Sequence, residues 1–191
     1  VGIAVAHFKS SLQEVIRCAV NAEKRAKSTL GRSALALSLL KHSGETIQWG
    51  CPWESEGLEL FELLTSNIQN GTISNRLPYR IVELLDPYFT YSTPLMQEKK
   101  GHAIVRDFNA KEIIEQEIAF SLNQLCPNTD LNQKIIQSFS TFLKNMCQLH
   151  AKLMNENNQN IQDVSNFIIQ GVVGICKSVA FIKAERNPSN T

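Results

Sequence analysis

The order of apolar and polar residues divides the 191-residue chain into a short first part with strand signals and a longer helical part. Residues 1–7 form a short apolar run, typical of a mostly buried strand. A helix is expected next, because Ser11 and Glu14 stand in capping-box relation. Gly31 is a natural left-handed stop for that helix. Its apolar residues recur at helical spacing: Leu12, Val15, Ile16, Ala19, Ala22 and Ala26.

The residues after Gly31 predict a β-hairpin. Leu35, Leu37 and Leu39 alternate with smaller residues, as expected for a strand. Ser43-Gly44 predicts a turn, and residues 46–50 return as the partner strand. The first part is therefore strand–helix–strand–strand, half of a small α/β sheet whose edge is uncovered if nothing precedes it.

The segment Cys51-Pro52-Trp53 ends the strand pattern, and helices are expected afterwards. The first of them ends at Asn70-Gly71, and the next has Pro78 in its first turn and ends at Asp86-Pro87. Residues 88–108 are a long irregular stretch, of a length that is usually functional or mobile. The apolar stripe of the first helix consists of Leu58, Phe61, Leu64 and Ile68.

Three further helices are expected after this stretch. The first is capped by Asn109 with Glu112 three residues on, and its stripe runs from Ile114 to Leu125. The last spans residues 161–182, after a polar connector, with Gly171 and Gly174 where a close neighbour can cross. Between them, a long helix has a coiled-coil-like seam that suits a helix partner or an internal core: Ile135, Phe139, Phe142, Met146, Leu149 and Leu153. The pattern predicts an α+β protein with domains at 1–53 and 54–191.

Composition narrows the class of protein. A hydrophobic content of 43% and a charged content of 19% indicate a globular chain. The net charge of +1 gives no global attraction to nucleic acid. The five widely spaced cysteines fit a reducing cytosol better than a disulfide framework. We expect no membrane span or signal peptide, and we interpret the chain, which begins at Val1, as a piece of a longer polypeptide.

Basic residues gather at the end of the first helix. They are Lys24, Arg25, Lys27 and Arg32. One interpretation is that these cations complement the helix dipole and require no ligand. The other is that Lys27 and Arg32 converge on an anion such as a nucleotide triphosphate, with Arg as a planar fork and Lys as a point charge.

Other candidate chemistry is sparse. The histidines lack a cysteine or second histidine at ligand spacing, although His7 and His42 are expected near neighbouring strand ends. No arrangement for nucleophilic catalysis is present, and the first fifty residues contain no Asp, so a two-metal palm site cannot be complete here. We therefore expect no catalytic residue and no metal ligand in this chain. In the long loop, aromatics and lysines could stack on a single strand or simply fix the loop: Tyr88, Phe89, Tyr91, Lys99 and Lys100.

The runs "GIAVAHFKSSL" and "AEKRAKSTLGRSALALSLLKHSGE" resemble the second half of a GGDEF or nucleotidyl-cyclase palm. They are most similar to the large, polymerase-palm subunit of type III-B CRISPR effector complexes, and the end "SVAFIKAERN" is similar to the C-terminal helix of that subunit. The resemblance implies a partial, ferredoxin-like β-α-β-β palm remnant followed by an all-α helical bundle.

The resemblance also implies an antiviral, RNA-guided function. Such subunits convert ATP into cyclic oligoadenylate with a divalent metal, Mg or Mn, held by a GGDD hairpin just upstream of the opening strand. That motif is absent from this chain, so the fragment alone is expected to be inactive and to hold no cofactor. The expected partners are the small helical subunits, with guide and target RNA reached through the complex, in the cytoplasm of a prokaryote and without a membrane.

By the same resemblance, Lys27 and Arg32 match positions that contact nucleotide phosphates, and Lys9 matches a recurring residue without an assigned role. Three residues separate Lys27 from Gly31, where diguanylate cyclases usually have two, which would rotate Arg32 relative to Lys27. Two alternatives stay open: a fragment of a GGDEF-type signalling cyclase, and a scaffolding subunit with a degenerate palm.

Overall fold

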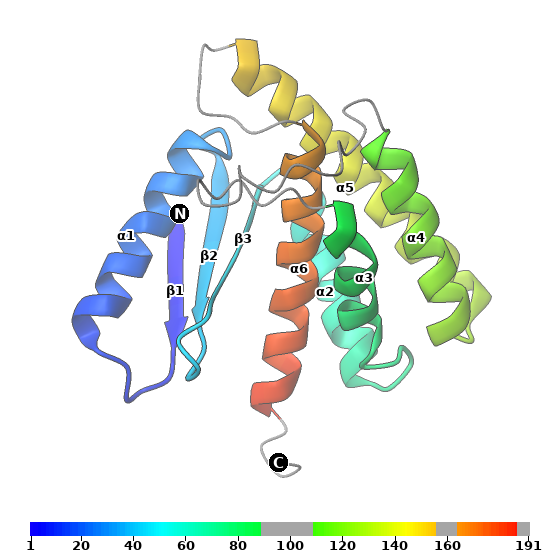
Figure 1. The fold of residues 1–191 in the computed structure, drawn as a ribbon, viewed down its shortest axis with the longest axis horizontal. Helices are drawn as coiled ribbons and strands as arrows, with labels where there is room; N and C mark the ends of the chain where they lie inside the picture. The colour runs from blue at the N-terminus through cyan, green and yellow to red at the C-terminus, as the bar shows by residue number, and fades with distance from the viewer. Residues whose placement is uncertain (89–108, 156–163, 187–191) are drawn as a thin grey trace, which may run out of the picture.

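A computed structural model describes residues 1–88, 109–155 and 164–186, and the elements within these ranges confirm the α+β class (Figure 1). The sheet comes first and helices make up most of the remainder. The elements are β1 (Gly2–Ala6), α1 (Leu12–Ser28), β2 (Ala34–Leu40), β3 (Thr46–Pro52), α2 (Gly57–Gln69), α3 (Leu77–Leu85), the 3₁₀ turn η1 (Asp86–Tyr88), α4 (Ala110–Leu125), α5 (Thr129–Asn155) and α6 (Val164–Arg186).

The sheet is mixed, with strand order β1-β2-β3. β1 is parallel to β2, with Ile3 opposite Leu37, and β3 is antiparallel to β2, with Trp49 opposite Leu37. Gly44 makes the hairpin turn at φ +86°, as its sequence predicts. In the described part of the chain, no strand pairs with the other edge of β1.

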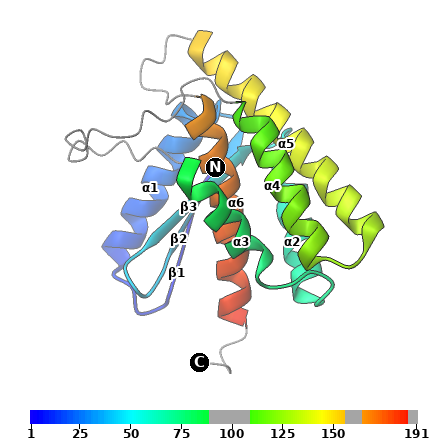
Figure 2. The same cartoon turned by 45° about the vertical axis from the view of Figure 1, so that its right-hand side comes forward.

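Helix α1 covers one face of the sheet and lies so near β1 that only glycine fits at position 2. A Cβ on Gly2 would lie 2.6 Å from the Cα atom of Glu23 and 2.8 Å from the carbonyl oxygen of Ala19. Helix α6 lies across the opposite face, between the sheet and the other helices (Figures 1 and 2). Its Gly174 sits against β3, where a Cβ would lie 2.7 Å from the carbonyl oxygen of Gln48. This confirms the close crossing expected at that glycine.

The helical seam of α5 is an internal core. All six of its predicted residues, from Ile135 to Leu153, are buried. α6 passes beside the seam at Gly171, where a Cβ would lie 3.0 Å from Cε of Met146. On the other side, Phe61 of α2 stacks on Trp49 with ring centroids 4.9 Å apart. Sheet and helices therefore share one contiguous core, and the expected boundary at 53/54 falls between β3 and α2.

Four local expectations were wrong. The first strand was expected to be mostly buried, but Ile3 and Val5 of β1 are 41% and 43% exposed, because β1 is an edge strand of the sheet. β3 continues through Cys51 and Pro52, because β3 is also an edge strand and Trp53, not Pro52, donates the hydrogen bond to the carbonyl oxygen of Ser33. Ser11 and Asn109 precede α1 and α4 as predicted, but neither side chain makes the capping hydrogen bond.

The fourth correction concerns α6, whose Val164–Ile182 segment is long and apolar enough to span a membrane, although no such run was expected. Because 67% of that segment is buried inside the protein, we interpret it as a core helix. The long loop with Phe89, Tyr91, Lys99, Lys100 and His102, and most of the polar connector, lie outside the described residues.

Candidate functional site

The chain leaves α1 through two consecutive left-handed residues. α1 ends at Ser28, and Gly31 and Arg32 have φ values of +79° and +69°. The expected glycine stop is therefore present, although the helix ends before it. Arg32 is exposed, and its backbone N–H donates to the carbonyl oxygen of Ala26 at 3.0 Å. A left-handed arginine is uncommon, since its Cβ crowds the backbone in this region.

Lys27 is also on the surface, where it pairs with an acid of its own helix. Its Nζ lies 2.7 Å from Oε1 of Glu23, and the Lys27 side chain is 64% exposed. The hydrogen bond from Lys27 lowers the pKa of the Glu23 carboxyl. Within the described residues, no hydrogen bond or ion pair joins Lys27 to Arg32. Their joint role in phosphate binding remains a prediction.

Arg25 differs from the other basic residues of α1, because it turns toward the sheet. Its Nη2 donates to the carbonyl oxygens of Leu37 at 2.7 Å and Trp49 at 3.3 Å. Burial lowers the pKa of this half-buried guanidinium. The sequence contained the signal, since Arg25 follows buried Ala22 by three residues and precedes buried Ala26, yet counting it with the surface cations concealed its inward direction.

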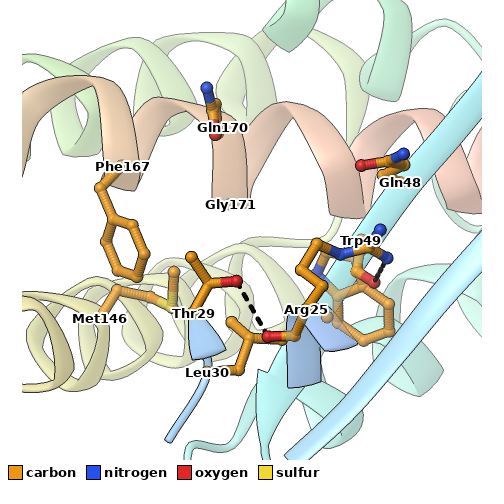
Figure 3. A pocket seen from close by; sticks show the side chains of 10 residues that line it. Arg25, Thr29, Leu30, Gln48, Trp49, Met146, Phe167, Gln170 and Gly171 are labelled. Carbon is orange, nitrogen blue, oxygen red and sulfur yellow. Dashed lines mark hydrogen bonds between the residues drawn. The ribbon is translucent and has the colours of Figure 1, made fainter. Parts of the chain in front are cut away.

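The side chain of Arg25 lines a pocket of about 180 Å³ (Figure 3). The pocket lies where the end of α1 meets β3, α5 and α6. No local sequence pattern predicts this pocket, because its walls come from four separate elements. Besides Arg25, its lining includes Gln48, Gln170, Leu30, Met146 and Phe167.

Within the described residues, the open edge of β1 carries backbone groups that pair with no other strand. The ammonium of Val1 donates to the carbonyl oxygen of Ala34, and the carbonyl oxygen of Val1 accepts from the N–H of Ala36. Bonding alternates along a strand, so Ile3 and Val5 also bond β2, and the N–H and C=O groups of residues 2, 4 and 6 point to the open edge. Such an edge is a ready template for another strand.

An apolar surface surrounds this edge. Leu12, Ile16 and Val20 recur every fourth residue on α1 and are 72%, 54% and 43% exposed. Ala19 and Glu23 of α1 touch β1, whereas Arg25 and Thr29 face the pocket beside β3. Helical geometry therefore places the stripe on the β1 side of α1, over the space beyond the open edge. We call this stripe, together with exposed Val1, Ile3, Val5 and Phe8, the β1-edge surface.

The two N-terminal histidines meet at the ends of neighbouring strands, as expected. The rings of His7 and His42 are 5.8 Å apart, and Nδ1 of His7 accepts from the backbone N–H of Lys9. His150 lies against Phe167 instead. In the described part of the chain, no three histidine, cysteine or acidic residues are grouped to hold a metal ion.

Cys51 and Cys176 are buried in the core. Burial raises the pKa of Cys51 to about 11 and that of Cys176 to about 12, so both thiols stay protonated and unreactive near neutral pH. Tyr88 lies partly buried in η1 against the core.

No family model matches this chain, and no curated protein does. The two features of the chain that bear on its function are the β1-edge surface and the basic end of α1.

Proposed function

We propose that this chain is the C-terminal part of the large subunit of a type III-B CRISPR antiviral effector complex. In the parent protein it completes the palm that binds ATP and makes cyclic oligoadenylate. Its helical part docks the small helical subunits and meets guide and target RNA through the complex. The parent would act in the cytoplasm of a prokaryote.

The observation that carries this proposal is the β1-edge surface. A strand added to the open edge of β1 would lie beneath Leu12, Ile16 and Val20 of α1 and would bury their exposed side chains. It would also satisfy the free backbone groups of residues 2, 4 and 6. A sheet whose covering helix extends past its last strand is what half of a palm would present.

The position of Lys27 supports an ATP site at the same edge. Lys27 follows Val20 by seven residues, so it lies on the same side of α1 as the apolar stripe. A phosphate near that edge could replace Glu23 as the partner of the lysine, since the present ion pair is exposed. Arg32 would add a planar fork from the turn that follows.

The chemistry of the palm would come from elsewhere in the parent. Attack of a ribose hydroxyl on an α-phosphate is assisted by divalent metal, and the first fifty residues contain no Asp to hold Mg or Mn. We assign this chain the phosphate side of the site and assign the metal ligands to a GGDD hairpin that pairs with β1. The chain alone is then inactive.

Docking of small subunits would use the outside of the bundle. The seam of α5 is buried within the chain and is not available to a partner. Large apolar side chains that remain exposed on the helices include Tyr79, Phe120 and Met154. These are the positions at which the proposal expects partner contacts.

The test uses the intact parent subunit in its complex with guide and target RNA, supplied with ATP and Mg²⁺, with products read by mass spectrometry. Lys27→Ala and Arg32→Ala should each lower oligoadenylate output about tenfold or more, because a charge-assisted hydrogen bond is worth about 1.5–3 kcal/mol. Lys24→Ala, at an exposed lysine of the same helix, is the matched control and should leave output unchanged.

Each other outcome overturns part of the proposal. Equal output from all three variants would leave Lys27 and Arg32 with only a helix-dipole role. A cyclic dinucleotide made from GTP would favour the GGDEF signalling cyclase, and no nucleotidyl transfer would favour a degenerate, scaffolding palm. Magnesium-dependent turnover by the 191-residue chain alone would contradict the missing metal site.

A further inference from the structure

The pocket beside β3 brings one cation and several apolar side chains together. Figure 3 shows Arg25 and Gln48 at one end of it, and Phe167 and Met146 at the other. Among the described residues, Arg25 is the only charged one in the lining, and no acid of that part of the chain lines the pocket beside it.

The described residues satisfy only part of the guanidinium of Arg25. Nη2 donates to the two backbone carbonyls, whereas Nη1 and Nε make no hydrogen bond to another described residue. Nor does Arg25 form an ion pair within the described ranges. A half-buried cation without a counter-charge favours an anion, and the planar fork of arginine matches a carboxylate.

The volume of the pocket limits the size of the apolar part of a ligand. Its volume of about 180 Å³ is similar to that of an engineered cavity of about 150 Å³ that binds benzene. Gly171 forms part of the wall, and any side chain there would press on Met146. The open space therefore suits a single flat ring lying against Leu30, Met146 and Phe167.

We propose that this pocket binds a small carboxylate with a flat, apolar body, with the carboxylate on Nη1 and Nε of Arg25 and the body between Phe167 and Met146. The site is separate from the β1-edge surface, so it stands whether or not the chain belongs to a palm. Gln48 and Gln170 would contribute amide contacts at its rim.

The first experiment titrates the 191-residue chain with benzoate and follows methionine methyl groups by NMR, since the chain has three methionines. The Met146 methyl should shift saturably, with a dissociation constant of about 1 mM or below. The methyl of Met154, which is 52% exposed and outside the pocket, should not shift. Benzamide, the neutral analogue, should bind about tenfold or more weakly.

The second experiment adds a carboxylate to the rim without disturbing Arg25. Gln48→Glu places an acid beside the guanidinium and should weaken benzoate about tenfold, because it supplies the missing counter-charge. Gln133→Glu makes the same charge change at an exposed position of α5 outside the lining and should have no effect. Since both glutamines are exposed, neither variant threatens the fold.

Four results would overturn the inference. Three of them are equal affinity for benzoate and benzamide, equal affinity of the two glutamate variants for benzoate, and no saturable shift of the Met146 methyl signal. Inorganic phosphate is the remaining probe, and binding as tight as that of benzoate would contradict the assignment to a carboxylate with an apolar body.

Discussion

Gly2 of β1 and Glu23 of α1 are in backbone contact, so that a Cβ on the glycine would lie 2.6 Å from the Cα atom of Glu23. This contact fixes the height of α1 above the sheet. It also determines where the stripe of Leu12, Ile16 and Val20 lies relative to the open edge. The β1-edge surface depends on this one small residue.

Gly2→Ala should therefore be strongly destabilising. The added methyl meets backbone of α1 rather than the end of a flexible side chain, so α1 or β1 must move. We expect a loss of about 3 kcal/mol, at the upper end for an overpacked core, measured by urea unfolding. Gly71→Ala is the control, because its Cβ meets open space and only the φ of +74° opposes it, at a cost of about 1–2 kcal/mol. A smaller loss at Gly2 than at Gly71 would contradict the tight contact.

Arg32→Gly should stabilise the chain. Arg32 has a φ of +69°, which glycine adopts without the steric cost of a Cβ, and its side chain is exposed. Removing that cost should raise the free energy of unfolding, by about 1 kcal/mol after the larger unfolded-state entropy of glycine is subtracted. Thermal or urea unfolding measures the change.

The same variant separates stability from function. If Arg32 contacts phosphate, Arg32→Gly in the intact parent should lower oligoadenylate output although the protein is more stable. Lys24→Gly, in the helical conformation of α1, should instead destabilise by about 1 kcal/mol. Lower stability of the Arg32→Gly protein would show that the side chain contributes more to folding than its conformation costs.

The ion pairs of Glu45 should make a small, pH-dependent contribution to stability. Glu45 lies 2.8 Å from Nζ of Lys41 and 3.5 Å from Nζ of Lys177, which links the hairpin to α6. The hydrogen bond from Lys41, with the charge of Lys177, lowers the pKa of the Glu45 carboxyl below its ordinary 4.5. A lowered folded-state pKa contributes stability that is present above the unfolded value and is lost as pH falls through the folded one.

Glu45→Gln should thus lower the free energy of unfolding at pH 7 by less than about 1 kcal/mol, because water screens the pair, whose Lys41 and Glu45 side chains are 35% and 46% exposed. The difference from wild type should shrink below pH 4.5 and vanish at more acidic pH. Urea unfolding at several pH values measures it. Glu54→Gln, at an exposed glutamate without an ion pair in the described ranges, is the control for removing one surface carboxylate. A difference in the free energy of unfolding between wild type and Glu45→Gln that grows as the pH falls would contradict this prediction.

The periodicity of the sequence predicted the buried face of α5, since burial on a helix repeats every 3.6 residues. It did not predict the buried face of α1, because the expected apolar stripe includes Leu12 and Ile16, which are 72% and 54% exposed. The seam of α5 and the crossing at Gly174 follow from such local patterns. The inward turn of Arg25 and the pocket beside β3 do not. They depend on where α1 ends relative to β3, α5 and α6, which is a tertiary relationship that no local spacing encodes.

A related limit applies to Lys27 and Arg32. Their residue types and the glycine stop were visible in the sequence, but the ion pair with Glu23 and the left-handed φ of Arg32 were not. Both depend on side-chain geometry and on how the turn closes onto Ala26. The sequence therefore identified the region and left open which way each cation faces.

The most direct test of the account is residue-resolved hydrogen exchange along β1, because the proposed palm requires a strand on its open edge. In the 191-residue chain, the amides of Ile3 and Val5 should be protected by β2, whereas those of residues 2, 4 and 6 should exchange fast. In the intact parent subunit, all of these amides should be protected. Fast exchange at residues 2, 4 and 6 in the intact parent would mean that no strand pairs with β1, and would contradict the palm.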